Sequence, residues 1–315
     1  MDMANLMQIE TAGLRGAYKR SEPMHTHVSW RAGGAVDRAY APADLDDLSV
    51  FLRRLPQHEP ILFVGLGSNL LIRDGGFRGT VVFTHRALAG LLLENDSSRP
   101  EIYAEAGVAT PKVARFAANH DMEGAEFLAG IPGTVGGVLA MNAGCYGSET
   151  WDVVVRVRTI DRAGKLHVRE PYEYNVAYRS VLPVHPRDEF FVAAWFGFAR
   201  GDGDRARQRV RELLAKRIAT QPLGEPNAGS VFRNPPQDYA ARLIEASGLK
   251  GRRIGGAEVS PIHANFIVNK GGATANDIEE LILLIQTTVH RTAGVRLERE
   301  VQIVGEALKA QHEHN

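Results

Sequence analysis

The sequence predicts an α+β protein of about two domains with a nucleotide-binding site. The chain has 315 residues, and domains average roughly 150 residues each. Segments typical of strands and of helices follow one another in a mixed order, with more strands than a repeated strand–helix–strand unit would give. Glycine makes up 32 of the residues, above the usual share of about 7%, and many of these glycines gather in a few short segments.

The N-terminal part is predicted to begin with a loose arm, because residues 1–20 are polar and follow no pattern. Apolar residues at helical spacing predict a helix over residues 45–55, and Pro56 ends it. Residues 61–65 form a short apolar run that ends in glycine, which is typical of a buried strand. Residues 81–84 predict another strand.

The middle of the chain predicts strands around one helix and one long loop region. Residues 101–106 alternate as a strand, which Gly107 ends. A helix is predicted over residues 111–120, because Pro111 suits a first turn, where its missing N–H would have no partner. Residues 129–147 are rich in glycine and predict loops. Further strands are predicted at residues 151–160, 167–169 and 190–198.

A change in composition at residues 201–204, Gly-Asp-Gly-Asp, precedes the C-terminal part. The next helix is predicted over residues 206–218, with Val210, Leu213, Leu214 and Ile218 on one face. A short helix over residues 239–247 would end at Gly248, and residues 262–268 indicate a strand.

The clearest helix of the chain is predicted over residues 274–292. Thr274 and Asp277 resemble a capping box at its start, and Gly294 ends it. Its apolar stripe comprises Ile278, Leu281, Ile282, Ile285 and Val289. Residues 295–304 alternate as a final strand.

Charge and composition exclude several classes of protein. The 37 basic residues balance the 37 acidic ones, which argues against a nucleic-acid partner. The one cysteine excludes an internal disulfide and a multi-cysteine metal site. No HExxH or CxxC pair indicates a catalytic metal either, so no metal is expected. No apolar run is long enough to span a membrane and no signal peptide is recognisable, so we expect a cytoplasmic protein. The His-Glu-His run at residues 312–314 is interpreted as part of a tail.

Three glycine-rich segments carry the functional signal, at residues 65–71 (GLGSNLL), 130–137 (GIPGTVGG) and 142–147 (NAGCYG). Glycine lets the backbone approach a phosphate closely and turn its N–H groups toward it. The Rossmann pattern does not fit, because Leu70 stands where its third glycine belongs, and no Gly-Lys-Ser/Thr of a P-loop follows. The segments nevertheless predict a dinucleotide pyrophosphate site.

These segments, in this order, resemble the FAD-binding loops of the UDP-N-acetylenolpyruvoylglucosamine reductase family. Three further segments are similar to elements of the same family: residues 27–34 (HVSWRAGG), 228–235 (AGSVFRNP) and 297–301 (LEREV). Together the resemblance covers residues 20–308.

The resemblance implies a vanillyl-alcohol-oxidase-like (PCMH-type) FAD-binding fold of two subdomains, with a C-terminal α+β substrate-binding domain. The corresponding division is an arm at residues 1–20, subdomains at 21–85 and 86–205, a substrate domain at 206–308 whose final strand returns to the active site, and a tail at 309–315. The implied reaction uses non-covalent FAD and NADPH to reduce UDP-N-acetylglucosamine enolpyruvate to UDP-N-acetylmuramate for peptidoglycan. The partners would be these small molecules only, and the protein a monomer.

The resemblance also assigns site residues. Arg179, in YNVAYRS, matches the catalytic arginine, Ser230 the proton donor and Glu300 the carboxylate beside them. Glu298 is the nearest alternative to Glu300. Cofactor-binding positions are Arg31, Gly33, Gly65, Gly67, Ser68, Asn69, Leu70, Gly107, Gly130, Pro132, Gly133, Thr134, Gly136, Gly137, Asn142 and Gly144. Substrate-binding positions are Lys216, Arg217, Gln221, Arg233, Asn234, His263 and Asn265.

The chain departs from the family pattern at Cys145, which replaces alanine, at Val28, which replaces threonine, and at Arg233, which replaces lysine. The segment between Arg179 and Ser230 is short and lacks the extra tyrosine-bearing loop of the longer members, so the chain resembles the type II members. Two alternatives remain open: an FAD oxidase of the same superfamily, and a non-catalytic nucleotide-binding protein.

Overall fold

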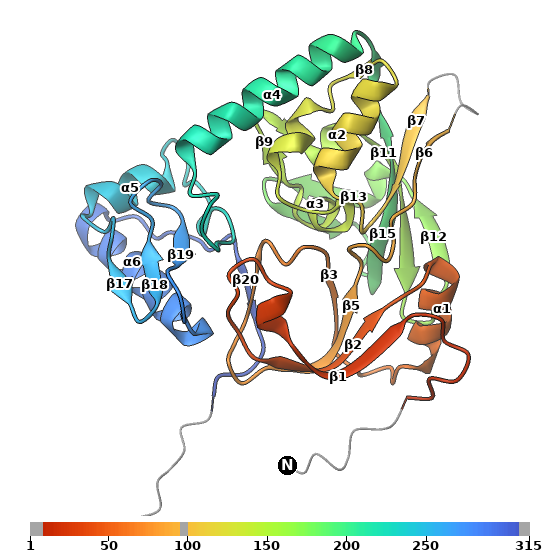
Figure 1. The fold of residues 1–315 in the computed structure, drawn as a ribbon, viewed down its shortest axis with the longest axis horizontal. Helices are drawn as coiled ribbons and strands as arrows, with labels where there is room; N and C mark the ends of the chain where they lie inside the picture. Colours follow the sequence, from red (N-terminus) through yellow and green to blue (C-terminus); the bar gives the residue numbers. More distant parts are fainter. Residues whose placement is uncertain (1–8, 95–99, 309–315) are drawn as a thin grey trace, which may run out of the picture.

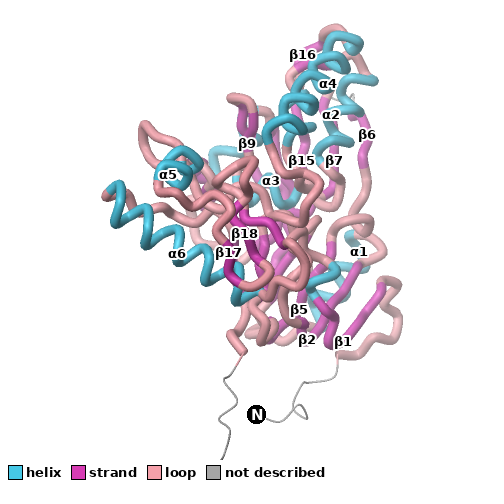
Figure 2. The backbone as a smooth tube through the Cα atoms, turned by 60° about the vertical axis from the view of Figure 1, so that its left-hand side comes forward, coloured by secondary structure: helices cyan, strands magenta, loops and turns pink. Residues whose placement is uncertain are grey.

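The computed structural model describes residues 9–94 and 100–308, and it divides into two lobes and a C-terminal domain (Figure 1). The predicted tail at 309–315 lies outside the described residues, as do residues 1–8 of the predicted arm. Helix α4 (Gly203–Thr220) runs from the second lobe toward the C-terminal domain (Figures 1 and 2). Within the described ranges, none of the helices combines the length and apolar character that crossing a bilayer requires.

The first lobe is a four-stranded sheet covered by helix α1 (Leu45–Arg54). The strands in spatial order are β1 (Ala17–Pro23), β2 (Ala35–Ala41), β5 (Phe77–Phe83) and β3 (Ile61–Val64). β1 pairs with β2 in antiparallel register, whereas β2–β5 and β5–β3 are parallel. Asp44 caps α1 by accepting from the Asp47 N–H, and the helix stops before Pro56, as predicted.

The first lobe also corrects the predicted arm, since β1 begins at Ala17. A short turn, η2 (Met24–Thr26), follows β1. Outside the main sheet, β4 (Leu70–Ile72) pairs in parallel with β20 (Gln302–Val304), so that the end of the chain returns to the first lobe.

The second lobe is an antiparallel five-stranded sheet with helices packed on it. Its strands in spatial order are β12 (Leu166–Arg169), β11 (Val154–Asp161), β15 (Glu189–Gly197), β7 (Glu101–Glu105) and β6 (Leu91–Glu94). Its helices are α2 (Thr110–Asn119), α3 (Val135–Met141) and the 3-10 turns η3 (Glu126–Gly130), η4 (Thr150–Asp152) and η5 (Pro171–Glu173). Short pairs are β8 (Met122–Glu123) with β16 (Ala199–Arg200), β9 (Gly144–Cys145) with β10 (Ser148–Glu149), and β13 (Tyr174–Ala177) with β14 (Ser180–Pro183).

The loops predicted over residues 129–147 contain helix α3, which the sequence pattern did not reveal. Close packing explains one of its glycines. Gly136 lies against Ala106, and an added Cβ there would be 3.0 Å from the alanine Cβ. Trp151, expected to open a strand, lies instead in η4, and β11 begins three residues later.

Helix α4 is longer than predicted, and its expected apolar face is wrong at Ile218, which is 69% exposed. It packs against α2 and η3 of the second lobe. The predicted substrate domain starts at residue 206, whereas this packing places α4 with the second lobe.

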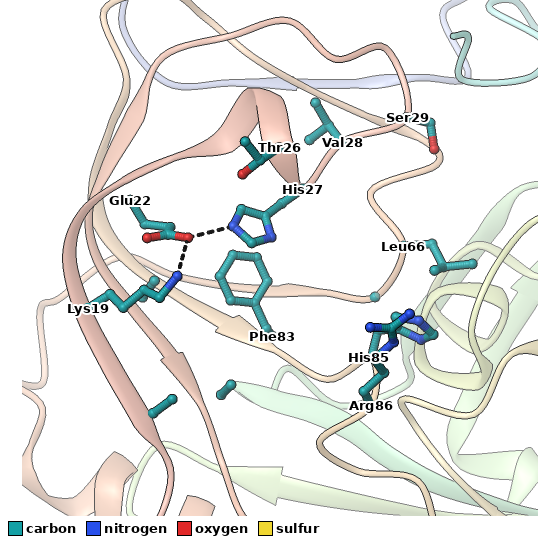
Figure 3. Close-up of a pocket in the computed structure, with 14 residues that line it drawn as sticks. Lys19, Glu22, Thr26, His27, Val28, Ser29, Leu66, Phe83, His85 and Arg86 are labelled. Atoms are coloured by element: carbon teal, nitrogen blue, oxygen red, sulfur yellow. Dashed lines mark hydrogen bonds and ion pairs between the residues drawn. The ribbon is translucent and has the colours of Figure 1, made fainter. Parts of the chain in front are cut away.

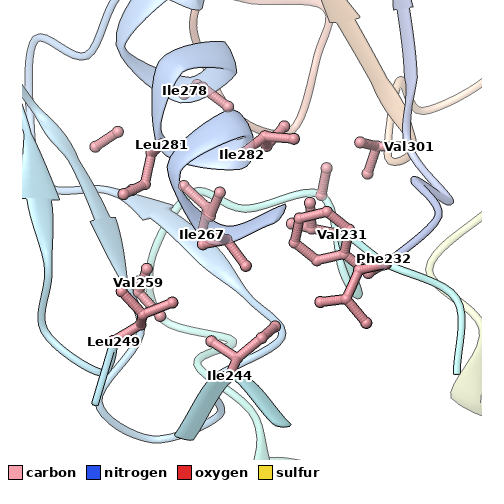
Figure 4. Close-up of a cluster of buried hydrophobic side chains, with 14 of the residues drawn as sticks. Val231, Phe232, Ile244, Leu249, Val259, Ile267, Ile278, Leu281, Ile282 and Val301 are labelled. Atoms are coloured by element: carbon pink, nitrogen blue, oxygen red, sulfur yellow. The ribbon is translucent and has the colours of Figure 1, made fainter. Parts of the chain in front are cut away.

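The C-terminal domain packs two helices on a three-stranded sheet around its own core (Figure 4). Its elements are α5 (Ala240–Ala246), β17 (Arg253–Ile254), β18 (Ala257–Val259), β19 (Ile267–Asn269) and α6 (Ala275–Ala293). The capping box of Thr274 and Asp277, the left-handed Gly294 and the buried stripe of α6 are confirmed. Figure 4 shows that stripe facing Ile267 of β19 and, across the domain, Val231 and Phe232.

Two predicted strands of this domain are mostly irregular. Only Ile267–Asn269 forms the strand expected at 262–268, because the Ser260 hydroxyl accepts from the N–H groups of Ile262 and His263 and holds a turn there. Only Gln302–Val304 forms the strand expected at 295–304, because the Glu300 N–H donates to the Val231 carbonyl instead of to a sheet.

Candidate active site

A cavity of about 490 Å³ lies where the two lobes and the C-terminal domain meet. The loop after β3, the start and body of α3 and the turn after it form its walls, and the hairpin tip between β13 and β14 adds Arg179. The end of α4, the loop at residues 228–230, Phe266 and the segment before β20 complete the lining. The cavity therefore collects residues from distant parts of the sequence.

The glycine-rich segments form a cradle in this cavity. A side chain at Gly65 would place its Cβ 2.1 Å from Thr134 Oγ1, and one at Gly67 would lie 2.3 Å from the His27 carbonyl oxygen. At Gly137, by contrast, an added Cβ would have nothing within 4 Å. The backbone is thus close-packed behind the cradle and open in front of it, which suits the close approach of a phosphate.

Thr134 supplies the test of whether a polar group fits this cradle. Its residue is 2% exposed, and its hydroxyl has no hydrogen-bond partner among the described residues. A buried hydroxyl without a partner costs about 1–3 kcal/mol of stability, so a ligand that forms a hydrogen bond with it would be favoured. The cradle fits the pyrophosphate of a dinucleotide such as FAD.

Arg179 and Glu300 form the charged centre of the cavity. Arg179 Nε donates to Glu300 Oε1 at 2.7 Å, and its terminal nitrogens donate to the carbonyl oxygens of Asn142 and Gly144 at 3.3 Å each. The guanidinium also lies over the Tyr178 ring, 4.8 Å from its centroid. Because arginine has five N–H donors, one hydrogen on each terminal nitrogen has no partner in the part of the chain that the structure describes.

The backbone conformation of Arg179 is unusual. Its φ of 54° lies in the left-handed region at the tip of the β13–β14 hairpin, where Ala177 and Ser180 pair. Non-glycine residues reach this region at a cost, and such strain gathers at functional sites. The hairpin thereby turns Arg179 toward the cavity.

Burial raises the pKa of Glu300, while the positive charges of Arg179 and Arg233 act to lower it. Glu298, the alternative from the sequence, is exposed and does not line the cavity. Ser230 lines the cavity one residue before Val231, whose carbonyl receives the Glu300 N–H at 2.8 Å. The loop that carries Ser230 and the segment that carries Glu300 are thus hydrogen-bonded to each other.

A second cationic group lines the cavity at Arg217. Burial lowers the pKa of Arg217, and its Nε donates to Gln221 Oε1 at 2.9 Å. Among the described residues it forms no ion pair with a carboxylate, and no carboxylate is among the groups that shift its pKa. Cys145 lies nearby, and burial raises the pKa of its thiol, so the thiol stays neutral and is a poor nucleophile.

The structure brings a large part of the predicted site to this cavity. The predicted residues that line it are Gly65, Gly67, Ser68, Asn69, Leu70, Gly130, Pro132, Gly133, Thr134, Gly137, Gly144, Arg179, Arg217, Gln221, Ser230 and Glu300. The predicted residues that do not line it are Arg31, Gly33, Gly107, Gly136, Asn142, Lys216, Arg233, Asn234, His263 and Asn265.

Four of the residues outside the lining serve close packing or turns. Gly33 and Gly107 would place a Cβ 2.3 Å from the Ile72 oxygen and 1.8 Å from the Thr84 oxygen, and Gly136 packs on Ala106. Asn142 ends α3 in a left-handed conformation, and its side chain binds Glu149 and the Trp151 N–H.

The other six lie away from the cavity or are engaged elsewhere. Arg31 and Lys216 are exposed. Asn265 uses both ends of its amide on the Phe232 backbone, at 3.0 and 2.8 Å. Asn234 accepts from the Ala240 N–H at the start of α5. His263 packs on Phe266, and burial lowers its pKa. Arg233 contacts the Arg179 carbonyl.

Several lining residues were missed by sequence reasoning. Met141, Phe266 and Gln302 line the cavity, and Tyr178 contacts Arg179. Gln302 arrives through the β4–β20 pairing, for which the sequence carries no local signal. Tyr178 could have been found from its place beside the predicted arginine.

A second cavity of about 470 Å³ lies on the other side of the loop at Gly65 and Leu66 (Figure 3). His27 lies against the Phe83 ring, with centroids 4.3 Å apart, and shares the Glu22 carboxylate with Lys19. Figure 3 shows His85 and Arg86 across this cavity from that cluster. No predicted site residue other than Gly65 lines it.

Two family models match the chain. The FAD binding domain matches residues 36–169, and the C-terminal domain of UDP-N-acetylenolpyruvoylglucosamine reductase matches residues 221–304. Those matches confirm the predicted fold class of an FAD-binding part with a separate C-terminal domain.

Curated relatives and a solved structure agree with these matches. The chain is 55% identical over 316 residues to UDP-N-acetylenolpyruvoylglucosamine reductase of Thiobacillus denitrificans, covering 96% of this chain and 98% of the relative. It is 51% identical over 294 residues to the enzyme of that name from Legionella pneumophila, covering 93% and 94%. The crystal structure of the Thermus caldophilus reductase superposes with a TM-score of 0.75 at 28% identity, covering 92% and 98% of the two chains. The chain therefore belongs to the UDP-N-acetylenolpyruvoylglucosamine reductase family.

Proposed function

We propose that this protein reduces UDP-N-acetylglucosamine enolpyruvate to UDP-N-acetylmuramate with FAD and NADPH, a step of peptidoglycan precursor synthesis. The observation that carries the proposal is the convergence of Arg179, Ser230 and Glu300 on the cavity that the glycine-rich segments also line. Relatives at 55% identity that bear the name of this reductase support the same reaction.

The glycine cradle and Thr134 would hold the FAD pyrophosphate. When bound, FAD accepts hydride from NADPH and supplies hydride to the terminal carbon of the enolpyruvyl group. Every other part of the chemistry belongs to the side chains of the protein.

Arg179 stabilises the charge that develops during reduction. Hydride addition to the terminal carbon leaves negative charge on the adjacent carbon and its carboxylate. The two N–H groups of Arg179 that have no partner among the described residues can form a fork onto that carboxylate, while its bond to Glu300 fixes the orientation of the guanidinium. The charge of arginine persists at any working pH.

Ser230 completes the reaction by giving its hydroxyl proton to the carbon that bears the carboxylate. Serine is a weak acid, so this transfer needs a strongly basic carbon and a cation that stabilises the remaining alkoxide. Arg179 lines the same cavity and supplies that cation. Arg217 and Gln221 would bind the anionic diphosphate of the substrate, since Arg217 has no carboxylate partner among the described residues.

The test follows the visible absorbance of the FAD-loaded protein without oxygen. We expect NADPH to bleach the flavin band and UDP-N-acetylglucosamine enolpyruvate to restore it. Recovery only with oxygen would indicate an oxidase instead, and a protein that does not take up FAD would contradict the proposal altogether.

We further propose that the protein works in the cytoplasm as a monomer, because one chain supplies the catalytic groups of the cavity. Light scattering after size-exclusion chromatography measures the molar mass and so tests whether the protein is a monomer. A dimer at micromolar concentration would contradict it.

A further inference from the structure

Arg233 lies behind the charged centre of the active site and outside the cavity. Its Nη2 donates to the Arg179 carbonyl oxygen at 3.2 Å, and its backbone N–H donates to the Glu298 carbonyl at 2.9 Å. Its Nε is buried and has no hydrogen-bond partner in the described part of the chain. The side chain thus joins the loop after Ser230 to the hairpin tip, and its backbone joins the same loop to the segment before Glu300.

The contact with the Arg179 carbonyl acts on a residue whose backbone is in the left-handed region. Arg179 has a φ of 54°, in the left-handed region that non-glycine residues adopt only at a cost. A neighbour that holds its carbonyl offsets part of this cost and limits the rotation of the hairpin tip. The guanidinium of Arg179 then stays within 2.7 Å of Glu300.

Arg233 is also the second of two cations that act on the Glu300 carboxylate. Burial raises the pKa of Glu300, while Arg179 on the hairpin and Arg233 on the loop after Ser230 oppose that rise. From the loop before β4, the neutral Asn69 amide donates to the Glu300 backbone carbonyl rather than to the carboxylate. Without Arg233, Arg179 would be the one remaining cation, among the groups that shift the pKa of Glu300, that counteracts the rise caused by burial.

We infer that Arg233 is a positioning residue for the reduction, which holds the Arg179 hairpin tip and supplies the second positive charge beside Glu300. This inference rests on the proposed function. This role replaces the substrate contact that the family resemblance assigned to Arg233. The side chain does not line the cavity, and it donates a hydrogen bond to the carbonyl oxygen of Arg179.

Three substitutions in the FAD-loaded enzyme separate the two effects. Arg233→Lys keeps the charge, Arg233→Gln keeps a donor for the Arg179 carbonyl, and Arg233→Met keeps neither. Arg252→Met is the matched control, because Arg252 is exposed on the same domain. Thermal unfolding of each variant checks that it folds.

The first readout does not depend on turnover. The carboxyl infrared band of Glu300, isolated by subtracting the spectrum of Glu300→Gln, gives the pH at which Glu300 is half protonated. We expect this midpoint to rise by about one pH unit in Arg233→Met and Arg233→Gln, and to stay in place in Arg233→Lys and Arg252→Met.

The second readout is the rate at which the enolpyruvyl substrate restores the flavin band. In Arg233→Met we expect a loss of about tenfold near neutral pH and an acid limb moved to higher pH, because a protonated Glu300 has lost the negative charge that makes its hydrogen bond with Arg179 strong. Bleaching by NADPH and the KM for the enolpyruvyl substrate should change less than about twofold. Arg233→Lys should recover the pH profile.

A raised KM with an unmoved pH profile would assign Arg233 to substrate binding and overturn the inference. An unmoved infrared midpoint in Arg233→Met would overturn the electrostatic part of it. If the wild-type enzyme itself does not respond to the enolpyruvyl substrate, the proposed function fails, and the infrared midpoint still decides whether Arg233 acts on Glu300.

Discussion

At the scale of single residues, the buried Thr134 hydroxyl gives a sharp test of cofactor binding. Replacing it in Thr134→Val removes a polar atom that has no partner among the described residues and keeps the shape of the side chain. We expect the FAD-free protein to gain up to about 1 kcal/mol of stability, because an unmet buried donor disappears. We expect FAD to bind about tenfold more weakly, as measured by flavin fluorescence titration.

Thr134→Ser, which keeps the hydroxyl, serves as the control and should retain FAD affinity. Equal FAD affinity of Thr134→Val and the wild type would show that the hydroxyl does not contact the cofactor.

Ser230 gives the second test at this scale. Ser230→Ala removes the proposed proton donor from a loop position that is not fully buried, so the fold should be unaffected. Stopped-flow absorbance should show bleaching by NADPH at the wild-type rate and a recovery with the enolpyruvyl substrate slowed by at least about a hundredfold. Unchanged recovery would remove Ser230 from the proposed mechanism.

Sequence motifs located the catalytic candidates because each motif is a short run of neighbouring residues. The same motifs could not separate residues that face the cavity from residues that hold it together. Ser230 lines the cavity, whereas Arg233 and Asn234, in the same loop, contact a backbone carbonyl and the start of α5. Which way a side chain points depends on partners that are distant in sequence.

At the scale of elements, helix α3 offers neighbouring glycines with different surroundings. In Gly137→Ala, the new methyl group has nothing within 4 Å and enters the cavity. We expect a gain of about 0.5–1 kcal/mol in unfolding free energy from better helix propensity, with FAD bound about tenfold more weakly. Urea unfolding of the FAD-free protein and a fluorescence titration measure the two effects.

Gly136→Ala is the matched control within the same helix. Its methyl group would lie 3.0 Å from the Ala106 Cβ, away from the cavity lining. We expect it to destabilise the protein by about 1–3 kcal/mol, and FAD affinity should change little in the variant that folds. A Gly137→Ala protein that binds FAD like the wild type would contradict the placement of α3 beside the cofactor.

Helices and strands were predictable where their apolar residues form one face that packs against a hydrophobic core. The stripe and both caps of α6 are confirmed, because Ile278 and its neighbours pack against the domain's own sheet. The strand predicted over residues 295–304 was wrong for residues 295–301, because Leu297 and Val301 are buried in the core of the C-terminal domain without pairing in a sheet. The β13–β14 hairpin carries Arg179 and was missed, because its tip residues, Tyr178 and Arg179, give none of the usual turn signals.

At the scale of the whole molecule, the site depends on how the C-terminal domain is attached to the first lobe. β20 pairs with β4, directly after the glycine-rich loop that follows β3. Beyond β4, the Asp74 carboxylate accepts from the N–H groups of Ala275 and Asn276 at the start of α6, at 2.9 Å each. This arrangement was not predictable, since each contact joins residues about 200 positions apart.

An ion pair strengthens the same junction and leads to a prediction about pH. Arg73 Nε and Nη2 donate to the two carboxylate oxygens of Glu279 at 2.8 Å each. These hydrogen bonds lower the pKa of Glu279 below its usual 4.5. A carboxyl group whose pKa is lowered by folding stabilises the protein above its usual pKa and loses that contribution as the pH falls through the folded value.

Glu279→Gln should therefore lower the free energy of unfolding by about 1 kcal/mol at pH 7, and the difference from the wild type should shrink as the pH falls below 4.5. Urea unfolding at a series of pH values measures it, and Glu280→Gln is the control, since Glu280 is exposed beside it. Because the pair joins the first lobe to α6, faster amide exchange at the start of α6 should accompany the loss. A destabilisation of equal size at every pH would mean that the side-chain packing of Glu279, rather than its charge, holds the junction.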